Sequence, residues 1–86
     1  MKPVIMFITS WCPYCRQANS IIKELKNTNP HYADIEVTII DEERQPEIAS
    51  QYDYYLVPTF YVDGVKLHEG IPSKAIVRKV FDEACK

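Results

Sequence analysis

The sequence feature that most constrains the fold is an apolar run that is followed at once by a pair of cysteines. Val4–Ile8 is a continuous apolar stretch, rich in β-branched and aromatic side chains, and Cys12 and Cys15 follow it, separated by two residues. A short run of this composition predicts a strand that is covered on both faces. The cysteine pair therefore stands where a central strand ends and the next element begins.

Periodic patterns predict that this next element is a helix. Residues 13–26 place apolar side chains at helical spacing, and the breakers within 27–30 end the pattern. Residues 35–40 then predict a second strand. Because a helix of about four turns joins the two strands, they are expected to pair in parallel through a right-handed crossover.

The second half of the chain predicts a further helix and a hairpin. A helix is expected from Asp41 to about Tyr52, with acidic residues and Pro46 near its start. A strand is expected from Thr59 to Val62, and Asp63-Gly64 is typical of a two-residue hairpin turn that leads into a strand over 65–68.

The last element is a helix with Ser73 as its N-cap. The predicted order is thus βαβα followed by ββα, an α/β fold in a single domain that spans residues 1–86. We find no internal repeat and no low-complexity segment.

Composition excludes several classes of function. Ten basic and twelve acidic side chains give a net charge of −2, which disfavours nucleic acid and anionic membrane surfaces as partners. Three cysteines allow only one disulfide, so a disulfide-scaffolded secreted domain is excluded. The apolar run near the N-terminus is too short for a signal peptide core or a membrane span. We therefore expect a cytoplasmic protein, in which paired cysteines favour catalysis or metal binding.

The spacing of Cys12 and Cys15 suits thiol chemistry. Backbone N–H groups and the helix dipole at a helix N-terminus favour a thiolate, and Arg16 is placed to add positive charge. Cys15 lies on the same helical face, within reach of a mixed disulfide on Cys12. Pro13, at the first helical position, removes one competing N–H donor and is expected to tune the redox potential.

Other interpretations of the pair have less support. A zinc site needs two more ligands, and His31, His68 and Cys85 are not spaced as a second pair, so no metal is expected. An inert buried pair is disfavoured because the turn is expected at the surface. Cys85 belongs to no motif and is interpreted as a bystander thiol that is able to be glutathionylated or to join two chains.

Several aromatic residues have two interpretations that the sequence leaves open. Tyr14 either contacts a substrate thiol or is a half-buried surface residue, and Trp11 either packs over the turn or covers the sheet edge. Tyr52, Tyr54 and Tyr55 either line a substrate groove or pack at the end of a helix.

Two short motifs resemble those of a known family. The tetrapeptide Cys12-Pro13-Tyr14-Cys15 resembles the active-site motif of dithiol glutaredoxins, and Val57-Pro58 resembles the Val–cis-Pro pair of the glutaredoxin and thioredoxin superfamily. By its position alone, Pro58 reads as an ordinary trans proline at a strand start. The resemblance instead implies a cis bond that faces Cys12, with the Val57 backbone offering a strand-like contact to a bound thiol peptide. It also implies a thioredoxin-like fold with a four-stranded mixed sheet and three helices.

The chain departs from both branches of this superfamily. Thr9 stands where glutaredoxins usually carry Lys or Arg, and His68-Glu69-Gly70 replaces their Gly-Gly pair and acidic residue. Trp11, before the first cysteine, and the stretch 70–74 resemble thioredoxins. Met6, however, stands where thioredoxins usually bury an aspartate.

The resemblance implies a small thiol–disulfide oxidoreductase of glutaredoxin type. Cys12 and Cys15 are expected to be catalytic, and the expected substrate or glutathione contacts are made by Trp11, Pro13, Tyr14, Val57 and Pro58. The expected partners are glutathione or disulfide-containing proteins, with glutathione or a reductase as electron donor, no bound cofactor and a monomeric state. The alternatives are a mini-thioredoxin reduced by a flavoprotein such as thioredoxin reductase, a non-enzymatic binding module and an iron–sulfur carrier.

Overall fold

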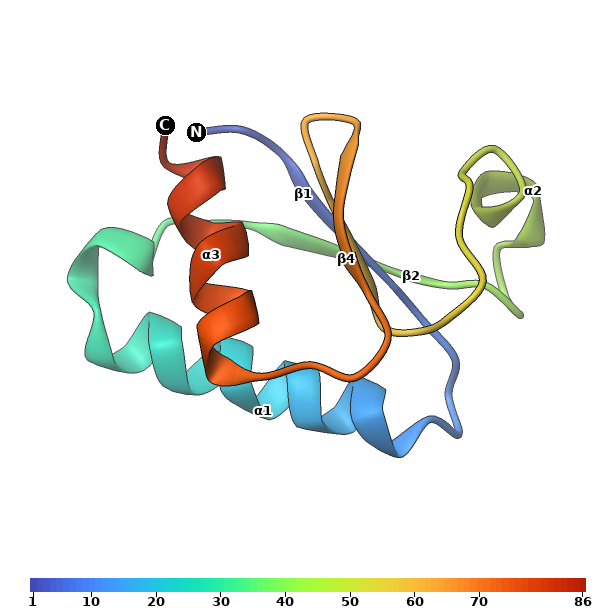
Figure 1. Ribbon diagram of the computed structural model, residues 1–86, viewed down its shortest axis with the longest axis horizontal. Helices are drawn as coiled ribbons and strands as arrows, with labels where there is room; N and C mark the ends of the chain where they lie inside the picture. The colour runs from blue at the N-terminus through green and yellow to red at the C-terminus, as the bar shows by residue number, and fades with distance from the viewer.

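A mixed four-stranded sheet organises the structure, a computed structural model that describes residues 1–86 (Figure 1). The strand order is β2-β1-β3-β4, which confirms the predicted sheet. The central strand β1 pairs in parallel with β2 and antiparallel with β3, and β3 pairs antiparallel with β4. The strands are β1 (Val4–Ile8), β2 (Val37–Asp41), β3 (Thr59–Val62) and β4 (Val65–Glu69).

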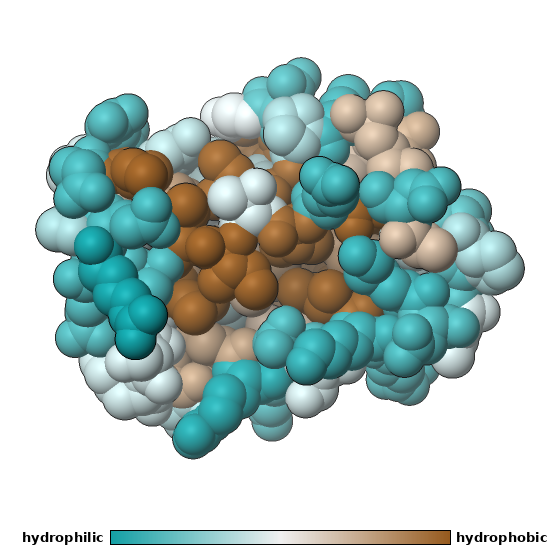
Figure 2. Space-filling view, turned by 180° about the vertical axis from the view of Figure 1, so that it is seen from behind, coloured by the Kyte–Doolittle hydropathy of each residue, from teal (hydrophilic) through white to brown (hydrophobic).

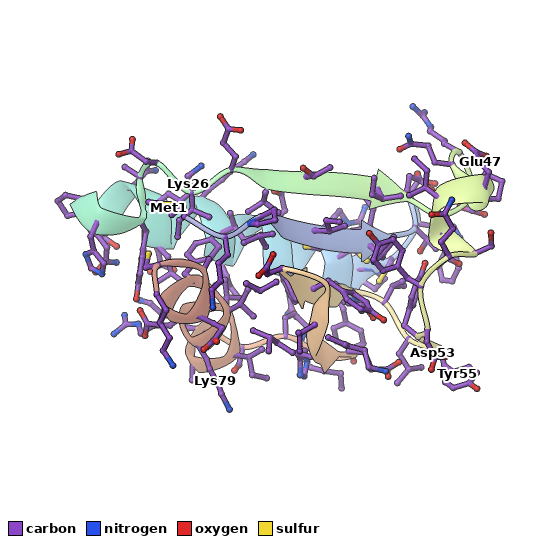
Figure 3. All side chains as sticks on the ribbon, turned by 90° about the horizontal axis from the view of Figure 1, so that it is seen from above. Met1, Lys26, Glu47, Asp53, Tyr55 and Lys79 are labelled. Carbon is purple, nitrogen blue, oxygen red and sulfur yellow. The ribbon has the colours of Figure 1, made fainter.

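Three α-helices and one short 3₁₀ helix cover the two faces of the sheet. In the view from above, α1 passes beneath the strands, on the face of the sheet turned away from the viewer (Figure 3). The largest core cluster joins α1 and α3 to this face, whereas α2 packs on the other. The helices are α1 (Pro13–Thr28), the 3₁₀ helix (Pro30–Tyr32), α2 (Pro46–Ala49) and α3 (Lys74–Ala84).

The main core lies between the sheet and the pair α1 and α3. Its fully buried side chains include Met6 of β1, Leu25 of α1 and Phe81 of α3. Burial of such side chains from water is the main favourable term in folding. The core therefore fixes α1, and with it the cysteine pair at its start, against the central strand.

A smaller core cluster fills the other face of the sheet beside α2. Phe7 of β1 is fully buried, and its ring centroid lies 4.8 Å from those of Tyr52 and Tyr54 and 5.8 Å from that of Tyr61. Tyr52 and Tyr54 therefore pack at the end of the α2 segment, one of the two interpretations that the sequence left open.

The predicted range of the second helix is wrong. Residues 41–52 were expected to be helical, but α2 spans only Pro46–Ala49. Asp41 is the last residue of β2, where it pairs with Ile8, and the next residue, Glu42, donates its N–H to the Ile8 carbonyl at 3.0 Å. Sheet pairing therefore takes Asp41 out of the expected helix, and residues 42–44 form the turn that follows the strand.

The hairpin and the final helix form as predicted. Asp63 and Gly64 have φ values of 50° and 81°, the left-handed conformation that a tight hairpin turn requires. The Ser73 hydroxyl accepts a hydrogen bond from the Ile76 N–H at 3.1 Å and so caps α3. No helix combines the length and the apolar character that a membrane crossing would need.

Candidate active site

The cysteine pair lies at the start of α1, as predicted. Cys12 is the N-cap residue with extended backbone angles, and Pro13 is the first helical residue. The Cys15 N–H donates to the Cys12 Sγ at 3.2 Å. A sulfur that accepts a backbone N–H at a helix N-terminus is stabilised as a thiolate. Cys12 thus has the surroundings of an attacking thiol.

The two sulfur-bearing residues are more buried than the sequence indicated. Cys12 is 5% exposed and Cys15 is 4% exposed, although Trp11 and Tyr14 beside them are 67% and 43% exposed. The turn lies at the surface, but capping directs the Cys12 side chain inward over the first turn of α1. The expectation of a surface turn holds for the backbone and is wrong for the thiols.

Val57 and Pro58, which lie just before β3, form the second part of the site. The Val57-Pro58 bond is cis, as the resemblance implied. The Cys12 thiol donates to the Val57 carbonyl oxygen, with an Sγ to O distance of 3.8 Å across 45 residues of sequence. The Val57 N–H has no acceptor within the chain. A free N–H and a carbonyl beside the thiol form an edge that an extended peptide is able to pair with.

Cys15 differs from Cys12 in its electrostatics. Burial, followed by the side-chain hydrogen bond with Cys12, raises the pKa of the Cys15 thiol to about 12. The nearby Glu42 carboxylate acts in the same direction, while the Thr9 backbone opposes it. Cys15 therefore remains a thiol at neutral pH.

The raised pKa of Cys15 predicts selective alkylation of the reduced protein. Because thiolates react with iodoacetamide, we expect Cys15 of the folded, reduced protein to stay unlabelled at neutral pH. Labelling of Cys15 should appear only as the pH approaches about 12 or after unfolding. Peptide mass mapping across this pH range gives the measurement. Labelling of Cys15 in the folded protein at pH 8 would contradict the assignment.

A small surface cavity opens on the Cys15 side of the site. Its volume is about 120 Å³, and its lining includes Thr9, Cys15 and the exposed edge residue Ile39 of β2. Thr9 is 5% exposed, and its hydroxyl has no hydrogen-bond partner in the protein.

Seen from behind, apolar side chains gather near the middle of the surface, with polar ones around them (Figure 2).

The position of Thr9 bears on glutathione binding. Glutaredoxins usually carry a cation at this position, but here the residue is buried and offers no charge. Two lysines elsewhere, Lys66 and Lys74, are paired with Glu69 and Glu24. Arg16 is exposed next to Cys15 and lines the same cavity, while the large exposed side chains beside the two motifs are apolar.

An exposed apolar rim flanks the two motifs. Tyr55 is 90% exposed and, unlike Tyr52 and Tyr54, does not belong to the aromatic cluster beside α2. Leu56 and Ile71 were not singled out from the sequence, although Leu56 precedes Val57, and Gly70, before Ile71, donates its N–H to the Pro58 carbonyl at 3.0 Å. For Leu56, the sequence signal is its place directly before Val57. Ile71 is brought near Pro58 by the bond from Gly70, which the sequence does not reveal. The rim residues are Trp11, Tyr14, Tyr55, Leu56 and Ile71.

The remaining chemistry-bearing residues lie apart from the pair. All three cysteines are free thiols, and the Cys85 Sγ, just after α3, lies 3.9 Å from the His31 carbonyl oxygen. His68 contacts the Ile71 carbonyl at 2.9 Å. No three side chains of His, Cys, Asp or Glu come together as a set of metal ligands.

Comparison with known proteins places this geometry in a family. Residues 3–82 match the family model described as Thioredoxin domain. The chain is 30% identical over 69 residues to a thioredoxin of Methanocaldococcus jannaschii, an alignment that covers 80% of this chain and 79% of that protein. It is also 33% identical over 57 residues to mouse glutaredoxin-3, covering 66% of this chain but only 16% of that longer protein.

A solved structure agrees with this assignment. Mitochondrial thioredoxin 3 from Saccharomyces cerevisiae, in its oxidized form, superposes with a TM-score of 0.73 and 25% identity, over 95% of this chain and 77% of that one. The sheet, the cysteine pair and the cis-proline loop therefore occur together in a chain that belongs to the thioredoxin-domain family.

Proposed function

We propose that the protein is a thiol–disulfide oxidoreductase that reduces disulfides through Cys12 and Cys15. The observation that carries the proposal is the position of the Cys12 Sγ, between the Cys15 N–H at 3.2 Å and the Val57 carbonyl oxygen at 3.8 Å. One contact stabilises a thiolate, and the other belongs to an edge for binding a peptide.

Two exchange steps account for the reduction. The Cys12 thiolate attacks one sulfur of the substrate disulfide, so that a Cys12–substrate S–S bond forms, the substrate S–S bond breaks, and the departing thiolate takes up a proton. Cys15 then loses its proton and attacks the Cys12 sulfur, which releases the second substrate thiol. The substrate gains two electrons and two protons, and the protein is left with a Cys12–Cys15 disulfide.

The environments of the two sulfurs explain why Cys12 attacks the substrate and Cys15 resolves the mixed disulfide. Cys12 accepts a backbone N–H, whereas burial raises the pKa of Cys15 to about 12. Because the thiolate is the attacking species, a protonated Cys15 does not compete with Cys12 for the substrate disulfide. With a glutathionylated protein as substrate, Cys12 alone suffices if a second glutathione completes the turnover.

The apolar rim supports a polypeptide as the substrate. Exposed aromatic and aliphatic side chains such as Trp11, Tyr55 and Ile71 suit apolar residues that flank a cysteine, and the Val57 edge suits an extended backbone. A disulfide-containing protein or a glutathionylated protein fits both features.

The electron donor is the part of the proposal that a single experiment tests directly. The oxidised protein is offered, in separate reactions, glutathione with glutathione reductase and thioredoxin reductase, each with NADPH. The Cys-Pro-Tyr-Cys motif favours glutathione as donor, so we expect NADPH consumption in the first reaction. Consumption only in the second would assign a thioredoxin-type donor. No consumption in either would contradict the proposed function.

A further inference from the structure

The loop of residues 53–58, which contains the Val57 backbone edge, is held in place by side chains from β3 and β4. The Tyr61 hydroxyl donates to the Asp53 carbonyl at 2.7 Å and accepts the Asp53 N–H at 3.2 Å. The Thr59 hydroxyl donates to the Leu56 carbonyl. These bonds hold the backbone of Asp53 and the carbonyl of Leu56. The N–H groups of Tyr55 and Leu56, just before Val57, are bound by a different side chain.

That side chain is the carboxylate of Glu69, the last residue of β4. Its Oε2 accepts the N–H of Tyr55 at 2.8 Å and the N–H of Leu56 at 3.1 Å. Two consecutive backbone donors thus converge on one carboxylate oxygen, directly before Val57. Hydrogen bonds to an ionised acceptor are about twice as strong as neutral ones.

Lys66 completes this arrangement, which we call the Glu69 clamp: Glu69, Lys66 and the backbone of Tyr55 and Leu56. The Lys66 ammonium donates to the second carboxylate oxygen of Glu69 at 2.6 Å and to the Asp53 carbonyl at 3.3 Å. Glu69 keeps its side chain only 23% exposed. Lys66 thereby orients the carboxylate and holds the start of the same loop.

An irregularity in β4 makes the clamp geometrically possible. Residues three apart on a regular strand point to opposite faces. Here Tyr61 pairs with Lys66 while Phe60 pairs with His68, so that β4 carries one extra residue. Such a bulge shifts the alternation, and Lys66 and Glu69 then stand opposite Tyr61 and Thr59, on one face of the sheet.

The charge state suits a permanent clamp. The hydrogen bond from Lys66, and then those from the Tyr55 and Leu56 N–H groups, lower the pKa of the Glu69 carboxyl to about 2. Glu69 therefore remains ionised throughout the range in which thiol exchange operates, and the clamp does not loosen near neutral pH.

We propose that Glu69 is a positioning residue for substrate capture, holding the Val57 backbone beside Cys12 so that an extended polypeptide disulfide meets a preformed edge. This inference rests on the proposed function. Glu69 contacts Tyr55 and Leu56 only through their backbone N–H groups, and these two residues stay 90% and 59% exposed. Figure 3 shows Tyr55 pointing away from the body of the protein. Because the loop is already ordered, substrate binding does not have to offset the entropy lost in ordering it.

The proposal distinguishes large substrates from small ones. A polypeptide disulfide uses both the Cys12 sulfur and the Val57 edge, whereas a small aromatic disulfide meets only the sulfur. Loss of the clamp should therefore weaken capture of the polypeptide and leave the reaction with the small disulfide unchanged. A general loss of stability would not produce this contrast.

The test is a Glu69→Gln variant, with Glu83→Gln as the matched control. Glu83 is likewise a lysine-paired carboxylate, with Lys2 and Lys86 as its partners, but it lies in α3, outside the clamp. For a polypeptide disulfide we expect Glu69→Gln to raise KM about tenfold with kcat within about twofold, since charge-assisted bonds and loop ordering each have this order of effect. The rate with a small aromatic disulfide should stay within about twofold. Glu83→Gln should match the wild type in all three quantities.

A second variant keeps the test decisive if Glu69→Gln folds poorly. Lys66→Met retains the carboxylate and its two N–H bonds, so we expect a smaller rise in KM for the polypeptide. An unchanged KM in Glu69→Gln, or equal losses with both substrates, would overturn the role of Glu69. If the wild type itself reduces neither substrate, the proposed function fails instead, so the two failures are distinct.

Discussion

A Cys12→Ser variant should lose at least about a thousandfold in the rate of disulfide reduction, because a serine hydroxyl is neither ionised at neutral pH nor a leaving group in thiol exchange. The fold should be unaffected, since serine is similar in size and a hydroxyl accepts the Cys15 N–H that now meets the sulfur at 3.2 Å. NADPH consumption with a coupled donor measures the loss.

Cys15→Ser provides the control for this result. Cys12 remains able to attack, but no resolving thiol follows, so a mixed disulfide between Cys12 and the substrate should accumulate and be visible by mass spectrometry. Residual turnover with glutathionylated substrates and free glutathione is compatible with this outcome. A Cys12→Ser variant that keeps full activity would instead point to a role in binding without turnover.

Phe7→Ala should lower the free energy of unfolding by about 3–5 kcal/mol, the usual cost of removing a buried aromatic ring. Phe7 is fully buried, and its ring lies among those of Tyr52, Tyr54 and Tyr61. Since small domains have a total stability of about 5–15 kcal/mol, a loss of this size is a large share of it. Denaturation in urea, followed by circular dichroism, gives the measurement.

Two further variants calibrate the Phe7 result. Phe7→Leu keeps most of the apolar volume and should cost less than Phe7→Ala. Ile71→Ala, at a side chain that is 62% exposed, should change the stability by no more than about 0.5 kcal/mol. A Phe7→Ala variant as stable as Ile71→Ala would show that the aromatic cluster contributes little.

Local patterns were enough to predict most elements of this fold. The run Val4–Ile8 forms the central strand, and the helix that follows begins at Pro13 with Cys12 as its cap. These features depend on residues close together in sequence, namely strand-length burial, helical spacing and a capping position. The same holds for the Asp63-Gly64 turn.

Prediction failed where a tertiary contact competed with a local preference. The acidic start of the expected second helix is instead the end of β2, because Asp41 pairs with Ile8 of the central strand. Likewise, the surface turn at Cys12 and Cys15 was foreseen, but the burial of both thiols was not. The contact that decided the first is the pairing with β1, and the Cys12 thiol is buried by local capping of α1 together with the distant Val57.

Local sequence was sufficient to predict two thiols at a helix start, and the family resemblance implied that Val57-Pro58 faces Cys12. The contacts that hold Val57 there could be found only in the folded sheet. Sheet pairing brings Val57 to Cys12 across 45 residues, and one extra residue in β4 turns Lys66 and Glu69 to the same face. The physical reason is that capping and periodicity are local, whereas strand register is set by the whole packed sheet.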